Sequence, residues 1–266
     1  MKYRKFISDT LEEASKIAKK YYGKVTGIVK PEDSNQVLTE ADLAIGKFIV
    51  SRVMAEYPDH NVIDEEAGVI DSGSDCTWVI DPIDGTSNFA KGVPLFGIIL
   101  GLLYKDQSFA GGVALPLFSE IYIAEKGKGA FCNGKRIKVT KEDKLLNCLV
   151  GYSIDGHRED PNLTREEVSL LGEIILNIRN LRSSGCVFDG MMVAKGKFGA
   201  DHHRNTNIWD VVGRQIIIEE AGGIFTDFYG KPIDYTNHLK RFSDHYPYCT
   251  APPALHEQLQ EIIHRK

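Results

Sequence analysis

The sequence predicts a mixed α/β (α+β) fold, with a large antiparallel sheet in the first half and a smaller α/β arrangement in the second. From Val62 onward, short runs rich in β-forming residues follow one another with little helical sequence between them. After Lys144, strand-like and helix-like segments alternate. We therefore expect two halves, 1–144 and 145–266, packed as one compact unit with a functional site between them.

The chain should open with two helices joined by a loop. Apolar residues recur at alternating spacings of four and three over the first stretch, which places them on one helical face: Ile7, Leu11, Ala14, Ala18 and Tyr21. Gly23–Gln36 is rich in Gly, Lys, Pro, Asp and Asn without periodicity, so we interpret it as a surface loop. A second helical pattern runs through Ala44, Phe48 and Val53.

Strands of one sheet should fill the rest of the first half. Three runs carry the β-rich composition: Thr77–Ile80, Phe96–Tyr104 and Ser108–Leu115. Glu120–Val139 alternates and contains Asn133–Gly134, a dipeptide that favours positive φ at both turn positions and predicts a two-residue hairpin.

The second half should contain a strand, then helices, and a further strand after a glycine pair. The expected segments are Cys148–Tyr152, Thr164–Ile178, Phe188–Ala194, Ile208–Ala221 and a terminal helix over Pro253–His264. Gly222 and Gly223 predict a helix stop, after which Ile224 and Phe225 suit a strand.

Composition narrows the class of protein. The net charge is −5, and no block of five or six like charges suggests a nucleic-acid arm or a membrane-binding patch. The longest apolar run, Val93–Tyr104, is shorter than the ~20 residues of a membrane span, so we expect a buried strand. Residues 1–22 lack the apolar segment of a signal peptide. We expect a cytoplasmic protein whose partner is a small molecule.

The cysteines indicate a reducing compartment. They are odd in number and widely separated, and none forms a C-x-x-C pair: Cys76, Cys132, Cys148, Cys186 and Cys249. We expect reduced thiols without a disulfide or zinc role.

The stretch Trp78–Phe89 carries the clearest chemical signal. A buried strand ends at Asp81, Pro82 interrupts its ladder, and Asp84 follows three residues later. Two carboxylates and the carbonyl of Ile83 are the oxygen ligands that Mg²⁺ prefers. Gly85, Thr86 and Ser87 would present consecutive backbone N–H groups to an anion, with a helix dipole if one begins there. The alternative is an Asp-Pro turn with an Asx-type hydrogen bond.

At this stretch the sequence resembles the inositol monophosphatase superfamily of magnesium-dependent, lithium-sensitive phosphatases, whose hallmark is W-V-x-D-P-[IL]-D-G-T-x-N-F. Three further motifs occur in the family's order: Leu38–Asp42 resembles its T-x-x-D, Ile63–Glu66 its G-E-E, and Trp209–Gly223 its W-D-x-x-x-G followed by E-A-G-G. The resemblance covers essentially the whole chain. It implies a layered fold of alternating helices and sheets, and a homodimer.

The resemblance also implies a site that holds two or three Mg²⁺ ions and hydrolyses a small phosphate monoester with an activated water. Metal ligands would be Glu65, Asp81, the Ile83 carbonyl, Asp84 and Asp210. Asp42 and Thr86, with Glu65, would orient the water, while Lys30 and Ser184 would face the substrate. Apart from the family pattern, either His203 or Arg204 would contact the leaving group, or both would be plain surface residues. No nucleophile elbow or Walker loop is present, which agrees with attack by water.

Simpler interpretations of these residues stay open. Glu65 and Glu66 could form a solvated pair, Asp42 could lie on a helix surface, and Lys30 could be a solvated loop residue. Asp210 could cap the helix that follows Asn207, a role compatible with ligation.

The sequence departs from the family at two points. Asp64 replaces a glycine common in relatives, and would either strengthen a metal site or face solvent. His203 stands seven residues before Asp210, where inositol-cleaving relatives place a sugar-binding glutamate. Zinc binding by His202 and His203 is unfavourable, because adjacent residues of a strand point to opposite faces.

The substrate is therefore open. Inositol monophosphate or a related sugar phosphate is the first interpretation. The alternatives are adenosine 3′,5′-bisphosphate, fructose 1,6-bisphosphate and histidinol phosphate, or a catalytically idle homologue that only binds.

Overall fold

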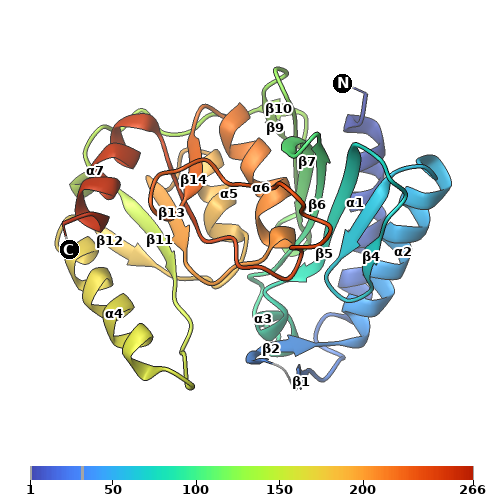
Figure 1. The fold of residues 1–266 in the computed structure, drawn as a ribbon, viewed down its shortest axis with the longest axis horizontal. Coiled ribbons are helices and arrows are strands. Elements are labelled where there is room, and N and C mark those ends of the chain that lie inside the picture. The colour runs from blue at the N-terminus through green and yellow to red at the C-terminus, as the bar shows by residue number, and fades with distance from the viewer. Residues whose placement is uncertain (1, 31–32, 266) are drawn as a thin grey trace.

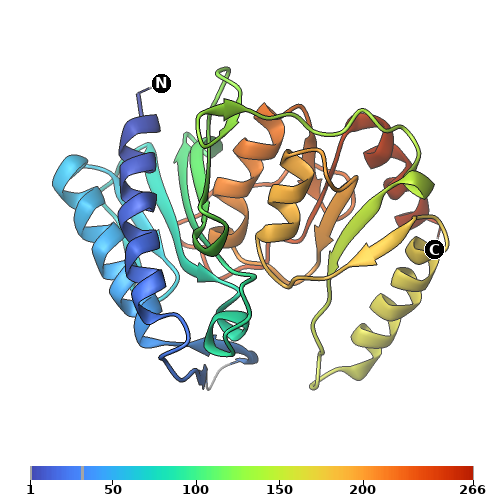
Figure 2. The same cartoon turned by 180° about the vertical axis from the view of Figure 1, so that it is seen from behind.

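Helices and sheets alternate in five layers. The computed structural model describes residues 2–30 and 33–265. Figure 1 shows α1 (Arg4–Tyr21) and α2 (Glu40–Glu56) outside the larger sheet, and α5 (Phe188–Ala194) and α6 (Ile208–Glu220) between the two sheets. Figure 2 shows from behind that α4 (Pro161–Ile175) and α7 (Pro253–Ile263) cover the outer face of the smaller sheet. This layering confirms the expected fold class.

The larger sheet comes from the first half of the chain. Within the described residues its strand order is β10-β9-β8-β7-β6-β5-β3-β4, and its pairs are antiparallel except β3 with β5. Its strands are β3 (Asn61–Asp64), β4 (Gly68–Ile70), β5 (Cys76–Asp84), β6 (Gly97–Tyr104), β7 (Gln107–Leu115), β8 (Glu120–Glu125), β9 (Ala130–Cys132) and β10 (Lys135–Arg136). The β9–β10 turn is made by Asn133 and Gly134, both with positive φ, which confirms the predicted hairpin.

The smaller sheet lies in the second half. Its order across the described residues is β12-β11-β13-β15-β14, with β11 parallel to both its neighbours and β15 antiparallel to both of its own. These strands are β11 (Leu149–Ser153), β12 (Asn180–Arg182), β13 (Ala200–His203), β14 (Ile224–Asp227) and β15 (Tyr248–Ala251). Single 3₁₀ turns span Pro116–Phe118 and Leu145–Asn147, and the short helix α3 covers Thr86–Ala90.

Strand β6 explains the longest apolar run in the sequence. Ile98, Leu100 and Leu102 pack toward α1 and α2, while Ile99 and Leu103 pack toward α6. Because both faces of the strand are buried, the sequence is continuously apolar where a half-exposed strand would alternate. None of the helices in the described part of the chain has the length and apolar character needed to cross a bilayer.

Helix α6 approaches the larger sheet closely, although it belongs to the second half of the chain. A Cβ on Gly101 of β6 would lie 2.7 Å from the backbone nitrogen of Gly213, and one on Gly213 would lie 2.7 Å from Ile99. Two glycines therefore permit this contact. One core cluster consequently joins residues of both halves.

Two expectations about the early chain meet different outcomes. The first helix buries Ile7, Leu11, Ala14 and Ala18 completely, as its periodicity predicts. The surface loop predicted over Gly23–Gln36 is wrong, because β1 (Ile28–Lys30) and β2 (Asp33–Leu38) pair as a hairpin. Residues 31 and 32, within that predicted loop, lie outside the described residues.

Candidate active site

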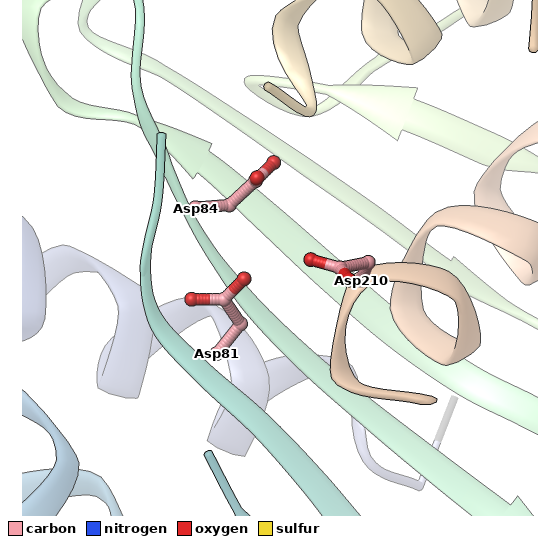
Figure 3. A group of neighbouring side chains, drawn as sticks. All are labelled: Asp81, Asp84 and Asp210. Carbon is pink, nitrogen blue, oxygen red and sulfur yellow. The ribbon is translucent and has the colours of Figure 1, made fainter. Parts of the chain in front are cut away.

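Asp81 and Asp84 lie where β5 ends. Asp81 pairs with Ile99 of β6 and Asp84 with Gly97, so the ladder is irregular between the two acids. Pro82 lies in this interruption and has no N–H to contribute. The side chains of Asp81, Asp84 and Asp210 point toward one another (Figure 3), and Asp81 is only 1% exposed.

Asp210 reaches the same point from the start of α6. It is the third residue of that helix, and its Oδ2 accepts the backbone N–H of Asn207 at 2.6 Å. The expected capping role is therefore present. The cap leaves the carboxylate aimed at β5, so capping and cation binding use the same orientation of the side chain.

The three aspartates form a site that fits a hard divalent cation. One oxygen from each lies within 4.8 Å of the others, and the buried Oδ1 of Asp81 has no hydrogen-bond partner among the described residues. Burial raises the pKa of Asp81 and of Asp210, and the pKa of Asp84 to about 7. Buried carboxylates this close together repel one another unless a cation or bound protons neutralise their charge. All the candidate ligand atoms are oxygens, which suits Mg²⁺.

Asp42 and Thr86 meet beside this cluster. The Thr86 hydroxyl donates to the Ile83 carbonyl at 2.7 Å and lies 3.2 Å from Asp42 Oδ1. The N–H and hydroxyl of Thr39 both donate to Asp42 Oδ2, at 2.8 and 2.5 Å. Asp42 is fully buried, so its interpretation as a surface residue is wrong. Burial raises the pKa of Asp42 to about 6, although the Thr39 hydrogen bonds act the other way.

Gly85 makes the turn from β5 into α3. Its φ is 89°, a left-handed conformation, and a Cβ there would lie 2.8 Å from the Cβ of Cys186. Only glycine suits this position. Thr86 and Ser87 then begin α3, and the first N–H groups of a helix have no partner within it.

Glu65 faces the same cavity but stands apart from the three aspartates. Its carboxylate lies 2.9 Å from Lys30 Nζ of β1, which is also 2.7 Å from Glu66. The side chains of Lys30, Glu65 and Glu66 are all nearly buried, so Glu65 and Glu66 are not a solvated pair. Burial raises the pKa of Glu65, which Lys30 opposes. Asp64 does not face solvent either, because its Oδ1 accepts the N–H groups of Glu66 and Ala67.

These groups surround a cavity of about 300 Å³. Of the predicted residues, its wall contains Glu65, Asp81, Ile83, Asp84, Gly85, Thr86, Ser87, Ser184, His203 and Asp210. Over the described ranges, Lys30, Asp42 and Arg204 lie outside this wall. Lys30 and Asp42 nevertheless contact residues that form it.

The two histidines of β13 point to opposite faces, as predicted. His203 lines the cavity, with Nε2 3.1 Å from Asp155 Oδ2, whereas His202 is fully buried between Tyr152 and Phe228. Arg204 instead lies over the Phe228 ring and contacts Tyr229. Arg204 is thus absent from the described cavity wall, although His203 and Asn205 on either side of it belong to that wall.

Two charged residues of the cavity wall were not predicted. Asp155 accepts hydrogen bonds beside His203, and Arg214 approaches Asp84 at 3.3 Å. Arg214 follows Asp210 by one helical turn, so the same-face rule for i and i+4 could have identified it. Asp155 lies just beyond the end of β11, and nothing in the sequence marks it.

A carboxylate cluster, a hydroxyl beside a buried acid and a helix start on one cavity define a metal-dependent phosphatase that hydrolyses small phosphate monoesters. A family model described as the inositol monophosphatase family matches residues 2–265. The chain belongs to this family.

Relatives and solved structures agree with this assignment. The chain is 31% identical over 223 residues to a fructose-1,6-bisphosphatase/inositol-1-monophosphatase of Aquifex aeolicus, covering 82% of each chain. It is 32% identical over 204 residues to human inositol monophosphatase 1, covering 74% of this chain and 73% of the relative. The solved IMPase of Thermotoga maritima superposes with a TM-score of 0.86 at 26% identity, covering 99% of this chain and 97% of that one.

Proposed function

We propose that this phosphatase hydrolyses a sugar or polyol phosphate with two or three Mg²⁺ ions. Glu65, Asp81, Asp84, Asp210 and the Ile83 carbonyl would hold the ions, which, when bound, lower the pKa of a coordinated water and stabilise charge on the phosphoryl oxygens. The observation that carries the proposal is the meeting of Asp81, Asp84 and Asp210 within 4.8 Å. A solved IMPase/NADP phosphatase of the same fold (TM-score 0.83, 23% identity, covering 100% of this chain and 96% of that one) was obtained with Mg²⁺ and phosphate.

The chain's own groups would then position the reactants. Asp42 accepts from Thr86, and this pair would orient and deprotonate the attacking water, with Glu65 beside it. The N–H groups of Gly85, Thr86 and Ser87 would bind the phosphate at the start of α3. Lys30 forms ion pairs with Glu65 and Glu66. When these two carboxylates bind a metal ion instead, the Lys30 ammonium group would be available to bind the substrate phosphate.

The leaving group would contact the opposite wall, at His203, Asp155 and Ser184. An imidazole offers a donor where a glutamate would only accept, so the site favours a leaving group that carries an acceptor or a second negative charge. We expect plain inositol phosphate to be a poor substrate.

The setting of the enzyme belongs to the same proposal. Five free thiols support a reducing, cytoplasmic location. The family resemblance supports a homodimer, which sedimentation analysis would test.

A phosphate-release screen with Mg²⁺ tests the substrate. The wild-type enzyme would be assayed with inositol phosphates, sugar phosphates, adenosine bisphosphate, fructose bisphosphate and histidinol phosphate. The Asp84→Asn variant, assayed with the same substrates, is the control. We expect fastest release from a sugar phosphate and none from Asp84→Asn. A preference for adenosine bisphosphate or histidinol phosphate would contradict the proposed class, and binding without release would indicate an idle homologue.

A further inference from the structure

A buried arginine lies against one of the acids proposed to hold metal. Arg214 projects from α6, its side chain is 3% exposed, and its Nη2 lies 3.3 Å from Asp84 Oδ2. A guanidinium keeps its proton at any ordinary pH. Arg214 therefore places a permanent positive charge beside a cluster that would receive cations.

The space around Arg214 is built to hold it. Its Nη1 lies 3.6 Å from Asp201 Oδ2 and donates to the Tyr248 hydroxyl, which in turn donates to Asp201 at 2.8 Å. A Cβ on Gly190 would lie 3.0 Å from Arg214 Cδ, and one on Gly151 would lie 2.7 Å from Asp201 Oδ1. Two glycines on neighbouring elements thus leave room for the ion pair.

The two oxygens of the Asp84 carboxylate have different roles in this arrangement. Its Oδ2 accepts the backbone N–H of Val187 as well as the guanidinium. One oxygen is therefore held by the protein, and the other remains for a cation. Asp201 is fully buried behind the arginine, where it offsets part of the positive charge.

We propose that Arg214, restrained by Asp201, is a positioning residue that fixes Asp84 and lowers the affinity of the Asp84–Asp210 end of the site for Mg²⁺. This rests on the proposed function, because it takes Asp84 as a metal ligand. The weakened end would hold Mg²⁺ tightly only when phosphate adds negative charge to the cavity. The site would then be completed by substrate and would loosen as phosphate leaves.

The test compares Mg²⁺ binding by calorimetry in the wild type, Asp201→Asn, and Asp201→Asn/Arg214→Gln, each with and without inorganic phosphate. Glutamine keeps a hydrogen-bond donor near Asp84 but removes the charge, and asparagine still accepts from Tyr248. Without phosphate, we expect Asp201→Asn to bind Mg²⁺ more weakly than the wild type, because the arginine loses its counter-charge. The double variant should bind it at least tenfold more tightly than Asp201→Asn, and phosphate should improve its affinity less. Arg214→Lys, which keeps the charge, should stay close to the wild type.

The outcomes separate this proposal from the proposed function. If the double variant melts cooperatively but binds Mg²⁺ no more tightly than Asp201→Asn does, the charge role of Arg214 is overturned. Wild-type Mg²⁺ affinity in Asp84→Asn would instead overturn the metal assignment itself.

Discussion

Replacing Asp42 by asparagine separates its chemical role from its structural one. Both Thr39 groups donate to Asp42 Oδ2, so the single amide oxygen of asparagine must stay with Thr39. The amide NH₂ then faces Thr86, which loses its carboxylate acceptor but keeps its hydrogen bond to the Ile83 carbonyl at 2.7 Å. The fold should survive while the proton acceptor beside the cavity is lost.

General acid–base groups contribute roughly 10²- to 10⁴-fold to rate, which is about 2.7–5.5 kcal/mol of barrier. We expect kcat of Asp42→Asn to fall by about this factor, with KM and Mg²⁺ affinity within about threefold of the wild type, because Asp42 lies outside the cavity wall. Since burial raises the pKa of Asp42 to about 6, wild-type kcat should also fall as the pH drops through that value.

Thr39→Ala is the matched control. It removes the helix-capping hydroxyl and should cost about 1 kcal/mol of stability, yet it leaves Asp42 facing Thr86. Steady-state kinetics and thermal melting of both variants provide the comparison. Two results would contradict this role: Asp42→Asn retains more than about a tenth of wild-type kcat, or kcat of Thr39→Ala falls as far as that of Asp42→Asn. In either case Asp42 only caps α2.

Three further predictions concern the metals and the leaving group. Lithium at tens of millimolar, an amount roughly sufficient to compete for a weak hard-ion site, should inhibit because it lacks the charge to stabilise the leaving oxygen; unchanged turnover would place the enzyme outside the sensitive branch. Burial raises the pKa of Asp84 to about 7 from an unfolded value near 3.9, so the metal-free protein should lose stability as the pH rises between these values. Mg²⁺ should restore that stability and release protons on binding, which melting curves and calorimetry in two buffers can detect. His203→Ala should raise KM for the best substrate without changing Mg²⁺ affinity; unchanged kinetics on every substrate would make His203 an ordinary wall residue.

Motifs with a local cause could be predicted from the sequence. The first helix follows from periodicity, and the turn at Asn133–Gly134 follows from the backbone conformations that those two residues tolerate. The convergence of Asp81 and Asp84 follows from a strand end and a proline. In each case the determinant lies within a few neighbouring residues.

Features that depend on distant partners could not be predicted. The β1–β2 hairpin leaves Ile28 and Val29 largely exposed, so no burial pattern marks it as sheet. Arg214 is buried against Asp201 and against Asp84, and Asp84 is 130 residues away in the chain. The contact of Lys30 with Glu65 likewise joins segments that sequence spacing does not relate.

The place of α6 on the larger sheet has a consequence for how the chain is made. The last strand of that sheet ends at Arg136, and α6 begins at Ile208. While the ribosome adds the residues between them, the sheet face that includes Ile99 and Val113 lacks its covering helix. A nascent chain with such a face is prone to aggregate and is a substrate for chaperones. Asp81 and Asp84 are also synthesised well before Asp210, so the emerging polypeptide acquires the complete aspartate cluster only late in translation.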